Sequence, residues 1–264
     1  MTQTISKIST QKTKGRYNLE LDGKFAFGVS EMTLIKFGLM KNRQLNEKDI
    51  IEIKKYEESA QAISKALTFL SHHLRTEKEV LQKLRVLDFS PSAIQSAIAY
   101  LKAEKYLDDR VYAENFVRTQ ANLSSLGPTV IDRKLRAVGV FQNDIDAALK
   151  DYPVDDQIEN AFNLAEKFQK HYAKNSIIQQ KQKINQALFA KGYHSDLIKQ
   201  VVERLDFQVD EDQQLANVRA VTDKIWSRYE KYGRQRAYKA RAYLYGKGFP
   251  AELIDRVIGE KDHG

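Results

Sequence analysis

The sequence predicts a mainly α-helical protein, an elongated tandem array of three-helix modules that follows a small N-terminal antiparallel β-meander. An apolar skeleton of helical spacing recurs four times, and alternating apolar patterning is confined to residues 4–29. Charged residues make up 30% of the chain, and the mean hydropathy is −0.55. This composition suits several small cores in series better than one large globule.

The repeat is clearest in residues 184–202, where two apolar helical faces meet across a Lys-Gly-Tyr turn. Four residue sets share its offsets: Val80, Leu84, Phe89, Ile94 and Ile98; Ile131, Leu135, Val140, Ile145 and Leu149; Ile184, Leu188, Tyr193, Ile198 and Val202; Ala240, Leu244, Phe249, Ile254 and Ile258. The copies follow one another at intervals of about 50 residues, which is typical of tandem supersecondary units. Each module is therefore expected to have a long first helix, then a second and a third helix joined by the turn.

The turn of each module begins with a residue suited to a left-handed conformation. Gly139, Gly192 and Gly248 occupy this position in three modules, and Asp88 is a tolerable but poorer choice in the first. The aromatic or branched residue that follows is predicted to fill the junction between the second and third helices.

The N-terminal patterning predicts three short strands. Asp22-Gly23 lies between the second and third of them, where a two-residue hairpin loop needs positive φ at both positions. Ser30 is predicted to cap a short helix that Gly38 ends. A sheet this small needs support from neighbouring helices.

The predicted domains are residues 1–45 (β-meander plus short helix), 46–105 (first module with a leading helix), 106–152 (second module), 153–208 (third module) and 209–264 (fourth, basic module). Asn46 and Asp49 are expected to cap the leading helix, which runs through Tyr56. The long first helices of the four modules are expected near residues 60–74, 109–124, 155–172 and 211–232.

Motifs of catalytic sites are missing from the sequence. There are no cysteines, which excludes thiol catalysis and thiolate zinc sites. No phosphate-binding loop, His-Glu-x-x-His or Gly-x-Ser-x-Gly motif is present, and the histidines are scattered. Asp108 or Asp109 is interpreted as a helix cap, because the alternative, a metal-ligand pair, lacks further ligands at suitable spacing. We expect a non-enzyme with no cofactor and no metal site.

No targeting segment is predicted. The apolar runs are only a few residues long, and the N-terminus lacks the hydrophobic core of a signal peptide. With the absence of cysteine, this favours a soluble cytoplasmic protein without a membrane partner, and we expect a monomer.

The positive charge is concentrated in one segment. The net charge of the chain is +8, which favours an anionic partner, with nucleic acid as the first possibility and an acidic protein surface or a membrane as the second. Residues 224–247 contain eight Lys or Arg residues and a single acidic residue, Glu230. The fourth module therefore carries most of the excess charge.

This segment also contains aromatic residues, and the combination predicts an interface for nucleic acid or for an acidic filament groove. Cations meet phosphates while aromatic rings stack on unpaired bases. The helical spacing predicts that Arg236, Lys239 and Tyr243 point outward. The alternative is that the tyrosines pack between helices and the cations only keep the surface solvated. The candidate residues are Trp226, Arg228, Lys231, Arg234, Arg236, Tyr238, Lys239, Arg241, Tyr243 and Lys247.

Several motifs together resemble the RecX family of regulatory proteins, in the longer form of Gram-positive bacteria. They are L-D-G-K-F-A-F-G-V-S-E at 21–31, L-R-T-E-K-E-V at 74–80, Y-L-D-D-R-V-Y-A-E-N-F-V-R at 106–118, and K-G-Y and K-G-F at the later turns. The resemblance covers nearly the whole chain. Arg75 and Arg118 lie in these motifs and are secondary candidates, for which a contact role and a structural role both stay open.

The resemblance implies a non-catalytic modulator, usually an inhibitor, of the RecA recombinase. Such a protein lies along the RecA–DNA filament and affects its assembly, ATP hydrolysis and strand exchange, in DNA repair, recombination and the SOS response. The alternative is a general DNA-binding protein, for single or double strands, without a filament partner.

Overall fold

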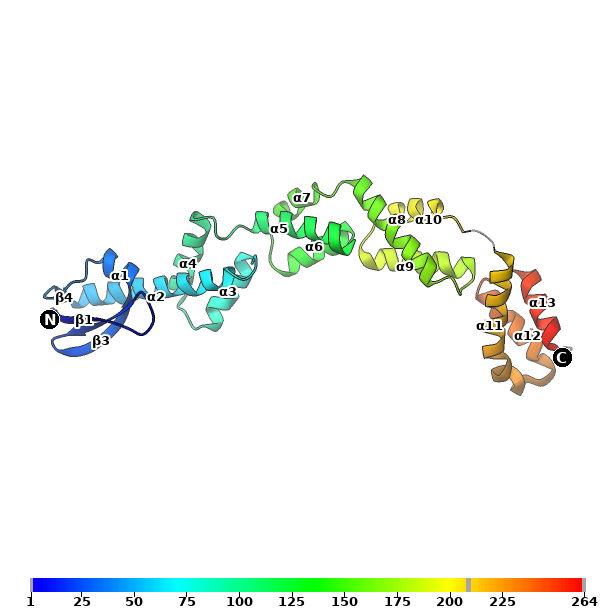
Figure 1. The fold of residues 1–264 in the computed structure, drawn as a ribbon, viewed down its shortest axis with the longest axis horizontal. Helices are drawn as coiled ribbons and strands as arrows, with labels where there is room; N and C mark the ends of the chain where they lie inside the picture. Colours follow the sequence, from blue (N-terminus) through cyan, green and yellow to red (C-terminus); the bar gives the residue numbers. More distant parts are fainter. Residues whose placement is uncertain (1, 208–209, 263–264) are drawn as a thin grey trace. The chain divides into compact units, whose positions relative to one another are not determined.

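The structure is a computed structural model that describes residues 2–207 and 210–262, apart from the side chain of Ser124 (Figure 1). These residues are mainly helical, with an antiparallel sheet near the N-terminus, as predicted. The chain divides into two compact units, Met1–Asn115 with Leu135–Asp146, and Phe116–Lys134 with Ala147–Gly264. The second module contributes to both units.

The described residues form a four-stranded sheet in the order β3-β2-β1-β4. Its strands are β1 (Thr2–Thr10), β2 (Arg16–Leu21), β3 (Lys24–Ser30) and β4 (Gln44–Asn46). The first three strands are the predicted meander, and Asp22 and Gly23 have the expected positive φ angles of 50° and 80°. The sequence did not predict β4, because three residues are too few to show an alternating pattern.

Two helices follow the strands. Helix α1 (Glu31–Lys36) begins at Ser30, whose side chain accepts the Thr33 N–H, as predicted. Helix α2 (Glu47–Leu70) begins with the predicted Asn46 cap, and Asn46 and Asp49 form a reciprocal capping box. The prediction of separate helices before and after Tyr56 was wrong, because α2 is continuous.

Glu57 connects the middle of α2 to the sheet and to α1. Its side chain is 4% exposed and faces the sheet. One carboxylate oxygen accepts Ser30 N–H and Thr33 hydroxyl, both at 2.7 Å, and the other accepts Arg16 Nη1 at 3.0 Å. Burial alone would raise the pKa of Glu57, but the hydrogen bonds from Ser30, Thr33 and Gln61 lower it below its usual value. This buried carboxylate therefore joins the sheet to the helix that continues into the first module.

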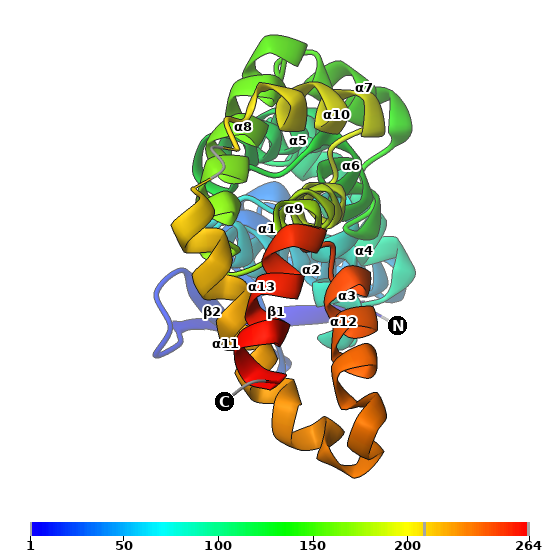
Figure 2. The same ribbon diagram turned by 90° about the vertical axis from the view of Figure 1, so that its right-hand side faces the viewer.

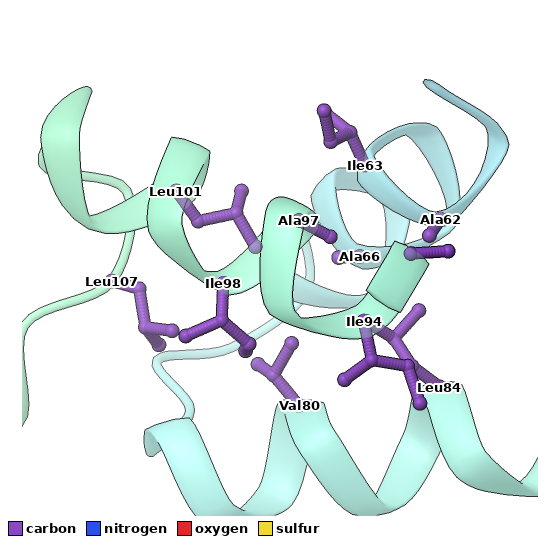
Figure 3. Close-up of a cluster of buried hydrophobic side chains, with 11 residues drawn as sticks. Ala62, Ile63, Ala66, Val80, Leu84, Ile94, Ala97, Ile98, Leu101 and Leu107 are labelled. Atoms are coloured by element: carbon purple, nitrogen blue, oxygen red, sulfur yellow. The ribbon is translucent and has the colours of Figure 1, made fainter. Parts of the chain in front are cut away.

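The first module consists of the C-terminal half of α2, α3 (Glu77–Val86) and α4 (Pro91–Ala103). Figure 3 shows Val80 and Leu84 of α3 pointing toward Ile94 and Ile98 of α4. The small side chains of Ala62, Ala66 and Ala97 belong to the same buried cluster.

The other modules repeat this arrangement. The second contains α5 (Asp109–Thr119), a π-helical turn η1 (Gln120–Ser124), α6 (Pro128–Ala137) and α7 (Gln142–Leu149). The third contains α8 (Val154–His171), α9 (Ile177–Lys191) and α10 (Ser195–Arg204). The fourth contains α11 (Glu211–Tyr229), a 3₁₀ turn η2 (Glu230–Gln235), α12 (Arg236–Gly246) and α13 (Ala251–Asp262). Figure 2 shows α11, α12 and α13 packed beside one another.

The repeated skeleton forms the module cores. All of its residues are buried except Phe89 and Leu149, which are partly buried. Tyr193 and Phe249, which follow the turn glycines, are 2% and 4% exposed. The turn positions Asp88, Gly139, Gly192 and Gly248 all have positive φ, between 59° and 95°. The predicted C-caps are therefore confirmed.

Consecutive modules are joined by the same type of contact, in which the start of one module's second helix touches the next module's turn. In the first compact unit, the Thr76 hydroxyl at the start of α3 donates to the Val138 carbonyl at 2.7 Å. Val138 directly precedes the turn residue Gly139, where a Cβ would come within 2.7 Å of Lys78 Cβ. The turn thus caps its own helix and also receives the preceding module.

The second compact unit contains two further joints of this kind. Gly127, just before α6, donates its N–H to the Lys191 carbonyl at 2.9 Å. The Ser176 hydroxyl, at the start of α9, donates to the Lys247 carbonyl at 2.5 Å. Each acceptor directly precedes a turn glycine, Gly192 or Gly248. In every joint the acceptor is the residue before the left-handed glycine.

Candidate nucleic-acid interface on the fourth module

The exposed cations of the fourth module gather at η2 and the beginning of α12. Lys231, Arg234 and Lys239 are exposed, and Tyr238 is 69% exposed. None of the ion pairs among residues 2–207 and 210–262 involves these three cations. Their charges are therefore available to an anionic partner.

Tyr232 belongs to the same surface, although the sequence did not single it out. Lys231 Nζ and Lys239 Nζ lie 5.3 and 5.7 Å from the centroid of its ring, which is within the range of a cation–π contact. Tyr232 is 41% exposed. We call Lys231, Tyr232, Arg234, Tyr238 and Lys239 the η2–α12 surface.

Trp226 and Arg236 contact each other. The Arg236 guanidinium lies 4.4 Å from the centroid of the Trp226 ring, and Arg236 Nε donates to the Trp226 carbonyl at 2.9 Å. Trp226 is also partly buried against the core of the module. This contact braces α12 against α11 and covers the indole face that a base would need.

Tyr243 does not point outward, and that prediction was wrong. The ring is partly buried against the module core and meets Tyr229 edge-on, with centroids 6.2 Å apart. The physical reason is a wider apolar stripe than expected, because Ala237, Ala240, Tyr243 and Leu244 follow the i, i+3, i+6, i+7 spacing of one helical face. For this residue, the alternative of packing between helices is the better description.

The α13 side of the module is charge-balanced. Arg241 Nε contacts Asp255 Oδ1 at 2.8 Å, and Arg219 contacts Glu260 Oε1 at 2.8 Å. Exposed ion pairs of this kind add little stability. The cations on this side are therefore paired, unlike those of the η2–α12 surface.

The remaining candidates, Arg228 and Lys247, line a cavity of about 310 Å³ that also contacts α11, α12 and the start of α9. Lys174 and Lys224 line the same cavity and were not among the predicted site residues. Lys174 belongs to the third module, and only the folded chain brings it near the fourth.

The secondary candidates lie elsewhere. Arg75 is held inside the first module, where its guanidinium lies 4.7 Å from the Phe69 ring centroid and 3.2 Å from Glu79 Oε1. Arg118 is exposed on α5 beside a cavity that Asp151, Asp156 and Glu159 also line. Acidic neighbours disfavour a phosphate at Arg118, and the contacts of Arg75 lie within its own module. A partner-contact role for either residue stays a prediction.

Asp108 and Asp109 act at helix starts. Asp108 Oδ1 accepts Arg110 and Val111 N–H groups at 3.0 and 3.1 Å, whereas Asp109 Oδ1 accepts the Glu77 N–H of α3 at 2.8 Å. Across the described ranges, no group of three or more acidic, His or Cys residues could hold a metal ion. Nor does this part of the chain contain a helix long and apolar enough to cross a membrane.

Comparison with protein families gives a match along almost the entire chain. Residues 3–46 match the regulatory protein RecX N-terminal domain, residues 62–101 the first RecX three-helix domain, and residues 108–149 the second. The third RecX three-helix domain matches twice, at residues 155–202 and 211–258. The third and fourth modules are therefore two copies of one domain type.

Individual proteins that are similar to this chain are named after the same family. Regulatory protein RecX of Leuconostoc mesenteroides is 45% identical over 257 residues, covering 97% of this chain and 96% of that protein. Regulatory protein RecX of Bacillus subtilis is 35% identical over 261 residues, covering 98% and 99%.

Solved structures agree with the sequence comparisons. A crystal structure of regulatory protein RecX superposes with a TM-score of 0.69 at 38% identity, covering 76% of this chain and all of that one. The crystal structure of RecX from Lactobacillus salivarius gives a TM-score of 0.55 at 36% identity, covering 58% and 99%. Four RecX domain models match five segments in order, and relatives are similar over nearly their full length, so this chain belongs to the regulatory protein RecX family.

Proposed function

We propose that the protein is a non-catalytic regulator of the RecA recombinase that binds along the RecA–DNA filament and changes its assembly, ATP hydrolysis and strand exchange. The observation that carries the proposal is the full-length match to the RecX regulatory family. A RecA partner implies a cytoplasmic protein that acts in DNA repair.

The modular architecture supports this proposal. Four three-helix modules in series present separate small surfaces, and modest contacts from each combine into one stronger interaction when the modules are linked. The η2–α12 surface supplies one such contact, either to a DNA phosphate or to acidic residues of the filament.

The test is the DNA-dependent ATPase and strand-exchange activity of RecA with stoichiometric amounts of the protein. We expect the wild-type chain to lower both activities. A variant with Lys231→Glu, Arg234→Glu and Lys239→Glu should be at least about tenfold weaker, because the loss of even one charge-assisted contact removes about 1.5 kcal/mol.

The control is a variant with Lys167→Glu, Lys170→Glu and Lys199→Glu on the third module. It has the same change in net charge, and all three lysines are exposed. Equal loss of inhibition in both variants would show that only overall charge matters. Unchanged RecA activities with the wild-type chain would disprove RecA regulation.

A second candidate function is general DNA binding without a filament partner, which the exposed tyrosines among unpaired cations favour. It predicts that the wild-type chain binds single-stranded DNA without RecA. The logarithm of the binding constant should then fall with the logarithm of salt concentration by about 0.7 per phosphate contact. RecA inhibition that persists in the η2–α12 variant after DNA binding is lost would place the RecA contact elsewhere on the chain.

A further inference from the structure

The cavity at the joint of the third and fourth modules is built from three segments of the second compact unit. The loop before α9 supplies one wall, a single face of α11 supplies the second, and the end of α12 with its turn supplies the third. The lining residues are Lys174, Asn175 and Gln179; Val221, Lys224, Ile225 and Arg228; and Tyr243, Lys247 and Phe249.

The charges around this cavity are all positive. Lys174, Lys224, Arg228 and Lys247 converge on it from all three walls, and no acidic residue lines it. None of the ion pairs found within residues 2–207 and 210–262 involves any of these four side chains. Positive side chains around a cavity repel one another and create a positive potential that attracts anions.

The cavity beside Arg118 has a different lining, which shows that positive charge is not shared by every cavity of the chain. Both cavities have a volume of about 310 Å³, but Asp151, Asp156 and Glu159 line the one beside Arg118. Surface cavities of this chain therefore do not share one charge. Of these two cavities, the one beside α11 is suited to an anion.

The floor of the cavity is apolar. Ile225 and Phe249 are 4% exposed, and the Tyr243 ring lines the site beside them. The first turn of α9 also contributes through Gln179, and the N-terminal end of a 15-residue helix favours negative charge. Cations at the rim with an apolar and aromatic floor suit a ligand that has an anionic end and a ring.

The volume narrows the choice of ligand. At about 310 Å³ the cavity is at the lower end of the range of small-molecule sites, and it is larger than a single inorganic anion needs. Lys247 Nζ lies 5.3 Å from the centroid of the Tyr243 ring, so these two side chains contact each other at the edge of the site. We propose that the cavity binds one nucleotide, with the phosphate held by Lys174, Lys224 and Arg228 and the sugar and base against the apolar floor of Ile225 and Phe249. The nucleotide is either a free mononucleotide or one unit of a nucleic-acid strand.

Binding of the nucleotide would also stabilise the contact between the third and fourth modules. The Ser176 hydroxyl and the Lys247 carbonyl already connect the two modules beside the cavity. A phosphate that is held by Lys174 on one side and by Lys224 and Arg228 on the other adds a second connection. A ligand that binds only the joined arrangement stabilises it by linkage.

The inference does not rest on RecA regulation, so its test omits RecA. Calorimetric titration of the full-length chain would compare a deoxynucleoside monophosphate, the corresponding nucleoside, inorganic phosphate and a short single-stranded oligonucleotide. We expect the monophosphate to bind more tightly than either the nucleoside or phosphate alone.

The informative variant is Lys174→Ala with Lys224→Ala. Both side chains are exposed, so the change should leave the thermal midpoint unchanged. We expect at least about a tenfold loss of affinity, the amount that corresponds to about 1.4 kcal/mol. Lys231→Ala with Lys239→Ala is the matched control, and it should keep the affinity for the monophosphate.

The outcomes separate the two sources of the nucleotide. Loss of monophosphate binding in the Lys174/Lys224 variant alone supports a site for free nucleotides. If only the oligonucleotide binds and the same variant weakens it more than the control does, the site holds one unit of a strand. Equal affinities of the two variants for every ligand, or no binding of any ligand, would overturn the proposal, whatever the effect on RecA.

Discussion

The third and fourth modules match the same domain type but differ in what they present to solvent. Their cores correspond closely, with Ile184, Leu188, Tyr193 and Ile198 in one and Ala240, Leu244, Phe249 and Ile254 in the other, all buried. The repeat therefore preserves the positions that face inward. Differences in function must come from the positions that the core does not constrain.

The outward differences concern both residue type and backbone. Residues 155–202 contain seven lysines and no arginine, whereas residues 211–258 contain six arginines and four lysines. The latter also have five tyrosines against two. Arginine forms bidentate contacts with phosphate and stacks on rings, which lysine does less well. In addition, η2 inserts a turn with Gly233 at φ 51° between the first two helices of the fourth module.

The largest expected effect tests whether the two cores are equivalent. Tyr193→Ala and Phe249→Ala should each destabilise the protein by about 3 to 5 kcal/mol, because each removes a buried ring and leaves a cavity. Thermal melting followed by far-UV circular dichroism measures the change. An unchanged melting midpoint for one variant would show that its residue is not part of the core. The cores of the third and fourth modules would then not be equivalent.

The turn glycines provide a smaller effect that should differ between the modules. A Cβ on Gly192 would lie 2.6 to 2.9 Å from three atoms of Val130, including its backbone nitrogen, whereas a Cβ on Gly248 would come closer than 3.0 Å to one atom among its three nearest neighbours, Ile178 Cβ at 2.8 Å. Both positions have positive φ, which costs alanine about 1 to 2 kcal/mol.

Neither the Val130 nitrogen nor Ile178 Cβ can move without its backbone, but a Cβ on Gly192 overlaps three atoms and one on Gly248 overlaps a single atom. Gly192→Ala should therefore cost about 1 kcal/mol more than Gly248→Ala, through the added overlap. Urea unfolding of the two variants measures the difference. Equal costs would show that the left-handed conformation alone determines the choice of glycine, with no contribution from the joint.

The smallest effect concerns the hydroxyl that distinguishes Tyr193 from Phe249. This hydroxyl donates to the Ser125 carbonyl at 2.9 Å. Burial, together with the hydrogen bond to Tyr152, raises the pKa of Tyr193 far above its ordinary value, so the group stays protonated. Tyr193→Phe should cost about 1 kcal/mol in urea unfolding. An unchanged free energy of unfolding would mean that the hydroxyl adds no stability and that Tyr193 and Phe249 are interchangeable.

The sequence was sufficient to predict the structural features that depend on the spacing of residues close together in the chain. The skeleton residues, the left-handed turns and the Ser30 and Asn46 caps all follow from periodicity and backbone preference within a few residues. The continuity of α2 could not be predicted, because the burial of Glu57 depends on partners in the sheet, such as Arg16.

The candidate site was less predictable for the same reason. Charge density identified the fourth module, but the stacking of Arg236 on Trp226 and the burial of Tyr243 depend on how α12 packs against α11. Lys174 could not be found, since it is 50 residues before Lys224 in the chain. No local pattern connects two residues that only folding brings to one cavity.

The joints between modules also bear on how such a chain can lengthen. The third module carries both halves of the contact, an acceptor carbonyl at Lys191 and a donor hydroxyl at Ser176. A gene segment that encodes such a module can be duplicated in place, because the new copy's acceptor meets the donor of the original. No interface has to be invented at the moment of duplication, and the added module is then free to diverge on its outer surface.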